Sequence, residues 1–104
     1  MAAKGYWVGR VQVHDQDKYA KYVEASAPAY TQFGARFLVR GGSYTAVEGA
    51  AYDRNVVIEF PDYQTAMDCY QSEVYGAAKL FRQAGATADI IVVEGYDGPQ
   101  PGDS

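Results

Sequence analysis

The sequence predicts an α+β fold, a ferredoxin-like β-α-β-β-α-β sandwich with a four-stranded antiparallel sheet. Four short segments rich in β-branched and aromatic residues alternate with two amphipathic helical regions in that order. The two halves of this pattern form a weak internal repeat of βαβ units. With 104 residues, of which 48% are hydrophobic, the chain is long enough for one core and too short for two.

The first predicted strand covers residues 5–14. Its apolar face carries Trp7, Val11 and Val13, because alternate residues of a strand point to the same side. The opposite face is polar except near its start. This alternation indicates a strand that packs against a core on one side.

A long helix is predicted after Asp15, whose carboxylate can cap the free amides of the first turn. Apolar residues recur after it at three- and four-residue intervals: Tyr19, Tyr22, Val23, Ala27, Tyr30 and Phe33. Pro28 lacks an amide proton and its ring clashes with the preceding turn, so we expect a kink or break near 26–28. Gly34 can take the positive φ angle that often follows a helix end.

The middle of the chain is predicted to form a hairpin and then another strand. Arg36–Arg40 is a short strand, and the glycine pair at 41–42 suits the positive φ angles of a tight turn. We expect residues 43–48 to form the returning arm of this hairpin and residues 49–53 to form a loop. Arg54–Phe60 is the clearest strand after the first.

Two helical pieces follow, capped by Asp62 and Ser72. Their predicted apolar stripes consist of Tyr63, Ala66, Met67 and Tyr70 in the first and Val74, Ala77, Ala78 and Phe81 in the second. The last strand is predicted over Asp89–Glu94. We therefore expect one domain over residues 1–96 and a flexible tail over residues 97–104, since the tail lacks apolar anchors.

One face of the predicted sheet needs a cover that the chain does not supply, because two helices can cover only one face of four strands. Alternation places Val57 and Glu59 on one side of the third strand and Ile91 and Val93 on one side of the last. Both faces of the sheet are thus substantially apolar, unlike those of a half-solvated sheet. We expect a two-fold homodimer with its sheets face to face.

Composition excludes several classes of function. The net charge of −4 opposes binding to nucleic acid, and no apolar run is long enough to span a membrane. Cys69 is the only cysteine and has no partner for a disulfide or a redox motif, so we expect it to be a small core residue. His14 is the only histidine, which argues against a metal site, and we expect no cofactor or metal. No signal peptide is recognisable, so we expect a cytoplasmic protein.

Five features of the sequence occur together at characteristic spacings. They are P-A-Y-T-Q-F-G-A-R-F-L-V-R-G-G at 28–42, V-V-I-E-F-P at 56–61, Y-Q-S-E-V-Y at 70–75, Arg82, and I-V-V-E-G at 91–95. The combination resembles the family called domain of unknown function 1330. The resemblance implies the dimeric α/β-barrel group, in which small ferredoxin-like proteins pair their sheets into a barrel. That group includes cofactor-free monooxygenases, muconolactone-isomerase-like enzymes, haem enzymes and ligand-sensing domains, so fold alone does not define function.

The resemblance supplies candidate ligand-binding residues without fixing a catalytic residue. The candidates are Arg40, Glu59, Tyr70, Ser72, Tyr75 and Arg82. They indicate a small-molecule-binding homodimer whose ligand is a small planar or carboxylated metabolite. Such a protein could be a cofactor-independent monooxygenase- or isomerase-like enzyme. The alternative is a non-catalytic ligand-binding or structural homodimer.

The charged strand residues allow two interpretations. In the first, tyrosines from both helices stack a planar ligand while Arg40 binds its oxygen and Glu59 acts as a base. In the second, the four charges formed by Arg10, Arg40, Glu59 and Glu94 make cross-strand ion pairs that only set the register of the dimer.

Overall fold

The structure, a computed structural model, describes residues 3–103. Positions 1, 2 and 104, which belong to the predicted domain and the predicted tail, lie outside the described residues. The elements in chain order are β1 (Gly5–Val13), α1 (Gln16–Gln32), β2 (Arg36–Arg40), β3 (Arg54–Phe60), α2 (Tyr63–Gln71), α3 (Glu73–Gly85) and β4 (Ala86–Glu94).

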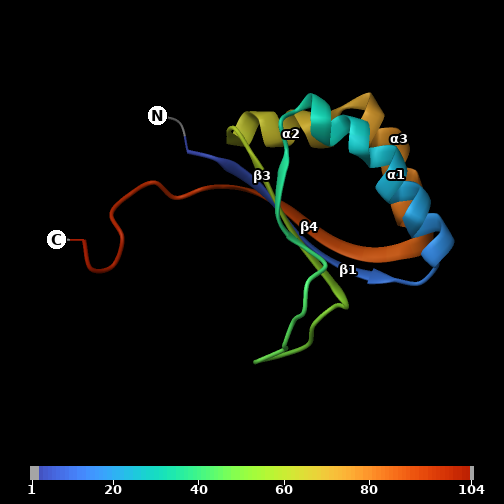
Figure 1. Cartoon of the computed structure of the whole chain (residues 1–104), viewed down its shortest axis with the longest axis horizontal. Coiled ribbons are helices and arrows are strands. Elements are labelled where there is room, and N and C mark those ends of the chain that lie inside the picture. Colours follow the sequence, from blue (N-terminus) through green and yellow to red (C-terminus); the bar gives the residue numbers. More distant parts are fainter. Residues whose placement is uncertain (1–2, 104) are drawn as a thin grey trace.

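The four strands form one antiparallel sheet in the order β2-β3-β1-β4. All three helices lie on the same side of this sheet (Figure 1). The predicted α+β fold with a four-stranded antiparallel sheet is therefore confirmed, and the second helical region consists of two helices that meet at Ser72.

Side-chain alternation along β1 produces the core. Trp7 on β1 lies opposite Ile58 on β3 and Val92 on β4, and all three belong to the face that the helices cover. Trp7 and Ile58 are both almost completely buried. Their neighbours Val8 and Val57 belong to the opposite face, which we call the outer face.

The helix α1 begins as predicted and continues further than predicted. Asp15 caps it by accepting a hydrogen bond from the Lys18 amide at 3.1 Å. Of the kink or break expected near 26–28, the break is wrong, because α1 continues through Pro28 to Gln32, and the kink stays a prediction. Pro28 is on the exposed side of the helix, and the buried Ala29 beside it holds the last turns against the core.

The hairpin between β2 and β3 is longer than expected. Gly41 has the predicted positive φ of 67°, and its amide donates to the Asn55 carbonyl at 2.9 Å. The chain therefore returns at β3 itself, and the returning arm predicted over 43–48 is wrong because these residues form no strand. Residues 41–53 form a loop that projects from the body (Figure 1).

The residues that α3 buries differ from the apolar stripe that the sequence predicted for this helix. It consists of Tyr75, Ala78, Arg82 and Gly85, whereas Val74 and Phe81 are 39% and 40% exposed. Of the predicted stripe, Ala78 alone is buried. The helix is rolled so that an arginine faces inward, which hydrophobicity alone does not predict. Further along, β4 begins three residues before the predicted strand.

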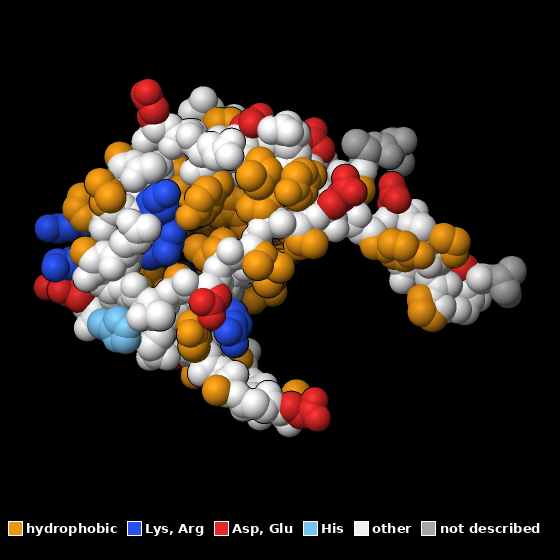
Figure 2. Space-filling model, turned by 180° about the vertical axis from the view of Figure 1, so that it is seen from behind, with side chains coloured by type: hydrophobic (Ala, Val, Ile, Leu, Met, Phe, Trp, Pro, Cys, Tyr) orange, Lys and Arg blue, Asp and Glu red, His pale blue; other side chains and the backbone are white. Residues whose placement is uncertain are grey.

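Two segments extend beyond the compact part of the chain. The 41–53 loop and the residues after β4 both project from the body, and hydrophobic side chains gather on the body between them (Figure 2). The predicted flexibility of the tail remains a prediction. None of the helices in residues 3–103 has the length and apolar character that crossing a membrane requires.

Candidate functional site

A cavity lies between α1 and the helix-covered face of the sheet. It is partly open to solvent. Aromatic rings form much of its wall, among them Trp7, Tyr22, Tyr30 and Phe37. Tyr30 meets Trp7 and Phe37 edge-on, with ring centroids 5.8 and 5.2 Å apart. Edge-to-face packing of this kind is favourable and leaves flat surfaces against which a ring can lie.

Three arginines line this cavity, each contributed by a different element. They are Arg40 on β2, Arg54 on β3 and Arg82 on α3. Each guanidinium lies over an aromatic ring, namely Phe37 at 4.1 Å, Tyr19 at 5.4 Å and Tyr22 at 5.7 Å from the respective ring centroids. Among the described residues, no carboxylate, imidazole or thiol lines the same cavity. The lining therefore carries positive charge without a compensating acid, in a chain whose net charge is −4.

Arg82 is the most buried of the three charges. Its side chain is 6% exposed, and its Nε makes no hydrogen bond within residues 3–103. Arg54 also has a buried Nε without such a partner. A buried donor that lacks an acceptor costs about 1–3 kcal/mol, and more when it is charged. The two arginines thus bring positive charge to the cavity wall without a carboxylate beside them in the lining.

A cluster of three tyrosine hydroxyls, which we call the tyrosine cluster, adjoins Arg82. The Tyr22 hydroxyl is 2.8 Å from the Tyr75 hydroxyl and 3.1 Å from the Tyr30 hydroxyl. Burial is the largest cause that raises the pKa of each of these phenols far above its usual range. The three hydroxyls therefore stay protonated near neutral pH and can act as hydrogen-bond donors.

The structure brings some of the predicted site residues together. Arg40 and Arg82 line the cavity, and Tyr75 reaches it through its hydrogen bond to Tyr22. Ser72 lies outside the cavity as the N-cap of α3. It accepts from the Tyr75 amide at 3.2 Å and donates to the Cys69 carbonyl at 2.7 Å, so it positions the helix turn that carries Tyr75.

Tyr70 lies behind the cavity wall and does not line the cavity. Its ring meets Trp7 edge-on at 5.6 Å between centroids and stacks at a tilt against Tyr75 at 5.3 Å. The Lys79 ammonium covers it at 4.9 Å from the ring centroid. Tyr70 therefore supports the ring of Trp7, which forms part of the wall.

Glu59 is separated from the cavity by the sheet. It lies on the outer face, opposite Arg36 on β2 and Tyr6 on β1, and accepts a hydrogen bond from the Tyr6 hydroxyl at 3.3 Å. The expectation that Arg40 and Glu59 act on one ligand is wrong, because Arg40 points to the helix-covered face.

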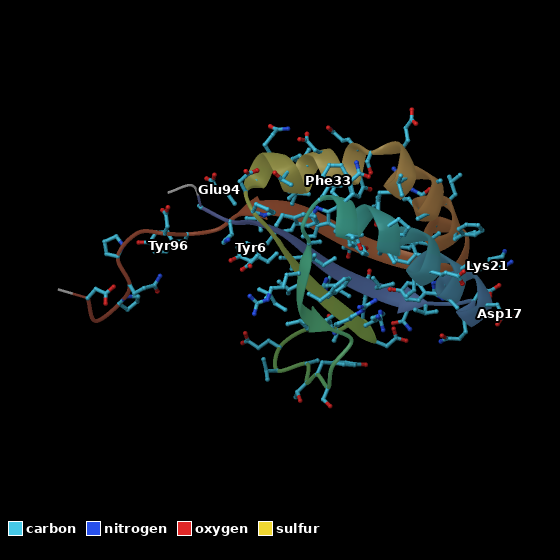
Figure 3. The ribbon with its side chains drawn as sticks, turned by 45° about the horizontal axis from the view of Figure 1, so that its top comes forward. Tyr6, Asp17, Lys21, Phe33, Glu94 and Tyr96 are labelled. Carbon is cyan, nitrogen blue, oxygen red and sulfur yellow. The ribbon has the colours of Figure 1, made fainter. Side chains whose placement is uncertain are left out.

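Within the described residues of the single chain, the four strand charges do not pair with one another. Arg10 pairs with Asp89 at 2.8 Å, and this is the only ion pair in residues 3–103. Glu94 is exposed at the end of β4. Figure 3 shows Glu94 and Tyr6 near the point where the tail leaves the sheet, away from α1's outer end at Lys21.

A family model described as a domain of unknown function, DUF1330, matches residues 4–96. The chain belongs to the DUF1330 family. This confirms the family that the sequence motifs indicated. No curated protein matches the sequence.

Solved structures share the fold of this DUF1330 protein. A protein of unknown function from Rhodopseudomonas palustris is 17% identical with a TM-score of 0.77, over 94% of this chain and 86% of that one. SnoaB, a cofactor-independent oxygenase from Streptomyces nogalater, is 12% identical with a TM-score of 0.61, over 95% of this chain and 96% of that one. At these identities the likeness concerns the fold.

Sequence reasoning missed Arg54 among the residues of the DUF1330 cavity, whereas it named Tyr22 and Tyr30 as core residues and left open that such tyrosines stack a ligand. Arg54 shares the alternation of Val56 and Ile58, which would have placed it on the inward face of β3. The two tyrosines were recognised as core positions, but their spacing carries no sign that their hydroxyls meet.

Cys69 is buried near the same helices without lining the cavity. Burial raises the pKa of its thiol to about 12, so the nucleophilic thiolate is scarce at neutral pH. Within residues 3–103, no group of three or more histidine, cysteine or acidic residues is placed to hold a metal ion.

Proposed function

We propose that this DUF1330 protein binds a small planar organic anion in the cavity between α1 and the sheet. One observation carries the proposal: Arg82 is buried among aromatic rings with an Nε that has no acceptor in the described chain. The aromatic wall suits a flat ligand, and the arginines suit its anionic oxygen. Positive charge concentrated in a cavity of an acidic protein also attracts anions to that place in preference to the rest of the surface.

The arginines of the cavity can stabilise negative charge on a ligand, but no carboxylate or imidazole lines the described cavity to take a proton from that ligand. A general base must lie within hydrogen-bond reach of the proton that it takes. Glu59 lies beyond the sheet, and no other acid lines the cavity in residues 3–103. The geometry thus supports anion binding better than isomerisation by a protein base. Cofactor-independent oxygenation is the second candidate, because such a cavity would hold a substrate in an electron-rich anionic form.

Benzoate should raise the melting temperature, and benzamide, its neutral counterpart, should not. At about a hundred times its dissociation constant, a ligand stabilises the folded state by about 2.7 kcal/mol. Arg82→Met should abolish this stabilisation. Arg40→Met, at the exposed rim, should weaken it while leaving the fold intact. Differential scanning fluorimetry measures both effects.

Lys21→Met is the matched control, because Lys21 is an exposed cation at the outer end of α1 (Figure 3). This variant should bind benzoate like the wild type. Equal responses to benzoate and benzamide, or wild-type binding by Arg82→Met, would contradict an anion site at Arg82.

We also propose that the protein is a homodimer whose outer sheet faces meet. An apolar row crosses all four strands in register on this face: Val39, Val57, Val8 and Ile91. Ile91 is 58% and Val39 is 43% exposed in the single chain. A continuous apolar surface of this kind is favourably covered by a second copy. A dimer of this kind is also compatible with a purely structural role, in which the cavity takes no ligand.

Ile91→Glu should convert the dimer into a monomer of 11.4 kDa, because it places a charge in the apolar row. Leu80→Glu is the matched control, since Leu80 is 65% exposed on α3, across the molecule from the outer face. Sedimentation at micromolar concentration should show a dimer for the wild type and for Leu80→Glu. A monomeric wild type would refute the sheet-face dimer.

A further inference from the structure

We propose that Gly9 determines which ligands the cavity accepts, because the flat, uncharged body of the ligand lies directly on the β1 backbone at this residue. A ring or conjugated plane takes the room that a side chain would otherwise fill. The inference rests on the proposed function, since it specifies the position and the shape of the planar anion that the same cavity takes.

Gly9 is an inward position in the middle of β1, a strand that is paired on both sides. Its Cα partners are Val56 on β3 and Ile90 on β4, and neither register is interrupted at this point. Gly9 is buried, shares the face of Trp7 and Val11, and lines the cavity. Alternation would place a core side chain here.

The backbone does not require glycine at this position. Gly9 is not among the glycines with a positive φ angle, and it lies within a regular strand without a bulge. Glycine in the interior of a strand lowers stability relative to alanine, because it loses more conformational freedom on folding. Where no bulge explains such a glycine, it often marks a place where a ligand or another backbone comes close.

Packing within the chain does not require this glycine either. Within residues 3–103, a Cβ added at Gly9 would meet a single atom of a non-adjacent residue within 4 Å, the Cγ1 of Ile90 at 3.5 Å. This is an ordinary van der Waals distance. Gly5 on the same strand differs, because a Cβ added there would collide with the backbone of Asp62. Packing therefore explains Gly5 and leaves Gly9 unexplained.

The space above Gly9 is not filled by the described chain. Tyr22, Ser26 and Tyr30 of α1 line the cavity, but none of them reaches the place of a Cβ at residue 9 within 4 Å. Protein interiors are normally close-packed, and both a void and a strand glycine lower stability. The two coincide at Gly9. Stability that is lost at one defined place is typical of a functional site.

The positions of the charges show which part of an anion would lie on Gly9. The guanidinium of Arg40 covers the Phe37 ring on β2, and that of Arg54 lies beside Gly41 at the end of the same strand. Both charges are therefore on the β2 side of the cavity. The side chains next to Gly9 on β3 and β4 are apolar. The uncharged body of the ligand therefore contacts Gly9.

The surface at Gly9 suits a flat ligand. The backbone of β1 is hydrogen-bonded to β3 and β4, so it presents a surface without polar groups that need a partner. A planar ring can lie parallel to this surface in van der Waals contact. A saturated ring is thicker, and a side chain at residue 9 would occupy the same room. Aromatic or conjugated anions are therefore the class that this position selects.

Gly9→Ala tests the inference, with benzoate as the probe. Differential scanning fluorimetry should show a melting temperature about 2–8 °C above that of the wild type, because alanine suits the strand better and fills part of the void. Isothermal titration calorimetry should show benzoate binding at least about fivefold weaker, because the added methyl group overlaps the ligand. A purely structural residue would not gain stability while binding is lost.

Gly76→Ala is the matched control. Gly76 lies within α3 and does not line the cavity, and a Cβ added there would meet nothing within 4 Å in the described chain. Alanine is more favourable than glycine in a helix, so this variant should also melt at a higher temperature. It should bind benzoate like the wild type.

Cyclohexanecarboxylate tests the selection by shape, because it has the charge and ring size of benzoate but a thicker ring. The wild type should bind it at least about fivefold more weakly than benzoate. Equal affinities would refute the selection of flat ligands.

Benzoate binding by the wild type separates the failure of this inference from the failure of the proposed function. If the wild type binds benzoate and Gly9→Ala binds it equally well, the role of Gly9 is refuted and the anion site stands. If Gly9→Ala lowers the melting temperature, the fold itself needs this glycine and the inference is refuted. If the wild type does not bind benzoate, both proposals fail.

Discussion

Raising the pH from about 10 to 12 should strongly destabilise this protein. Tyr22, Tyr30 and Tyr75 all have pKa values that burial raises far above the usual value of 10.0. In the unfolded chain these phenols ionise near pH 10, whereas in the folded chain they keep their protons. The unfolded state therefore binds fewer protons above pH 10, and the free energy of unfolding falls as the pH rises.

The size of the effect follows from the number of groups. Each tyrosine lowers the free energy of unfolding by about 1.4 kcal/mol per pH unit in this range. Between pH 10 and 12 the three together remove up to about 8 kcal/mol, which is comparable with the whole stability of a typical domain. Below pH 10 the same groups are protonated in both states and cause no pH dependence.

Thermal melting followed by far-ultraviolet circular dichroism from pH 8 to 12 measures this loss. Tyr30→Phe removes one of the three groups, so its stability should fall less steeply with pH than that of the wild type. Tyr63→Phe changes an exposed tyrosine and should keep the wild-type slope. A melting temperature that stays constant to pH 12 would show that the three phenols ionise in the folded state.

Trp7→Ala should lower the free energy of unfolding by about 3–5 kcal/mol, the usual cost of truncating a large buried aromatic residue. Trp7 is 3% exposed and donates from its indole nitrogen to the Ala66 carbonyl at 2.9 Å. Its ring also packs against Tyr75 and Phe60 at 4.8 and 5.1 Å between centroids. It thus connects β1 with β3, α2 and α3.

Urea titration at one fixed protein concentration measures this change. Circular dichroism is the suitable signal, because Trp7 is the only tryptophan of the chain. Trp7→Phe keeps most ring contacts and should cost about 1–3 kcal/mol. Val47→Ala alters a side chain that is 86% exposed in the 41–53 loop and should change stability by less than about 0.5 kcal/mol. Equal losses for Trp7→Ala and Val47→Ala would contradict the central position of Trp7.

Several elements could be predicted from the sequence because their signals are local. The three helices are capped by Asp15, Asp62 and Ser72, as their positions in the sequence indicated. Each side chain accepts a hydrogen bond from the backbone amide three residues later. Alternation along Arg54–Phe60 correctly placed Ile58 inward. These features depend on neighbours a few residues away, and the sequence displays those neighbours directly.

The predictions that failed depend on packing between distant segments. Proline usually ends a helix, but α1 continues past Pro28 because buried residues on both sides of it hold the helix against the core. The predicted stripe of α3 followed hydrophobicity, but the roll of this helix buries Arg82 beside the tyrosine cluster and leaves Phe81 40% exposed. A charged residue can face inward when aromatic rings and hydroxyl groups of another helix contact its charged group.

By itself, the sequence determined the order of the elements, the family and the inward faces of the strands, because periodicity and capping are properties of short stretches. Tertiary structure decided which polar groups meet. Arg40, Arg54 and Arg82 come from β2, β3 and α3, and they share a cavity because the sheet order β2-β3-β1-β4 and the roll of α3 bring these elements around α1. The sheet also separates Glu59 from Arg40, because the two side chains leave adjacent strands on opposite faces.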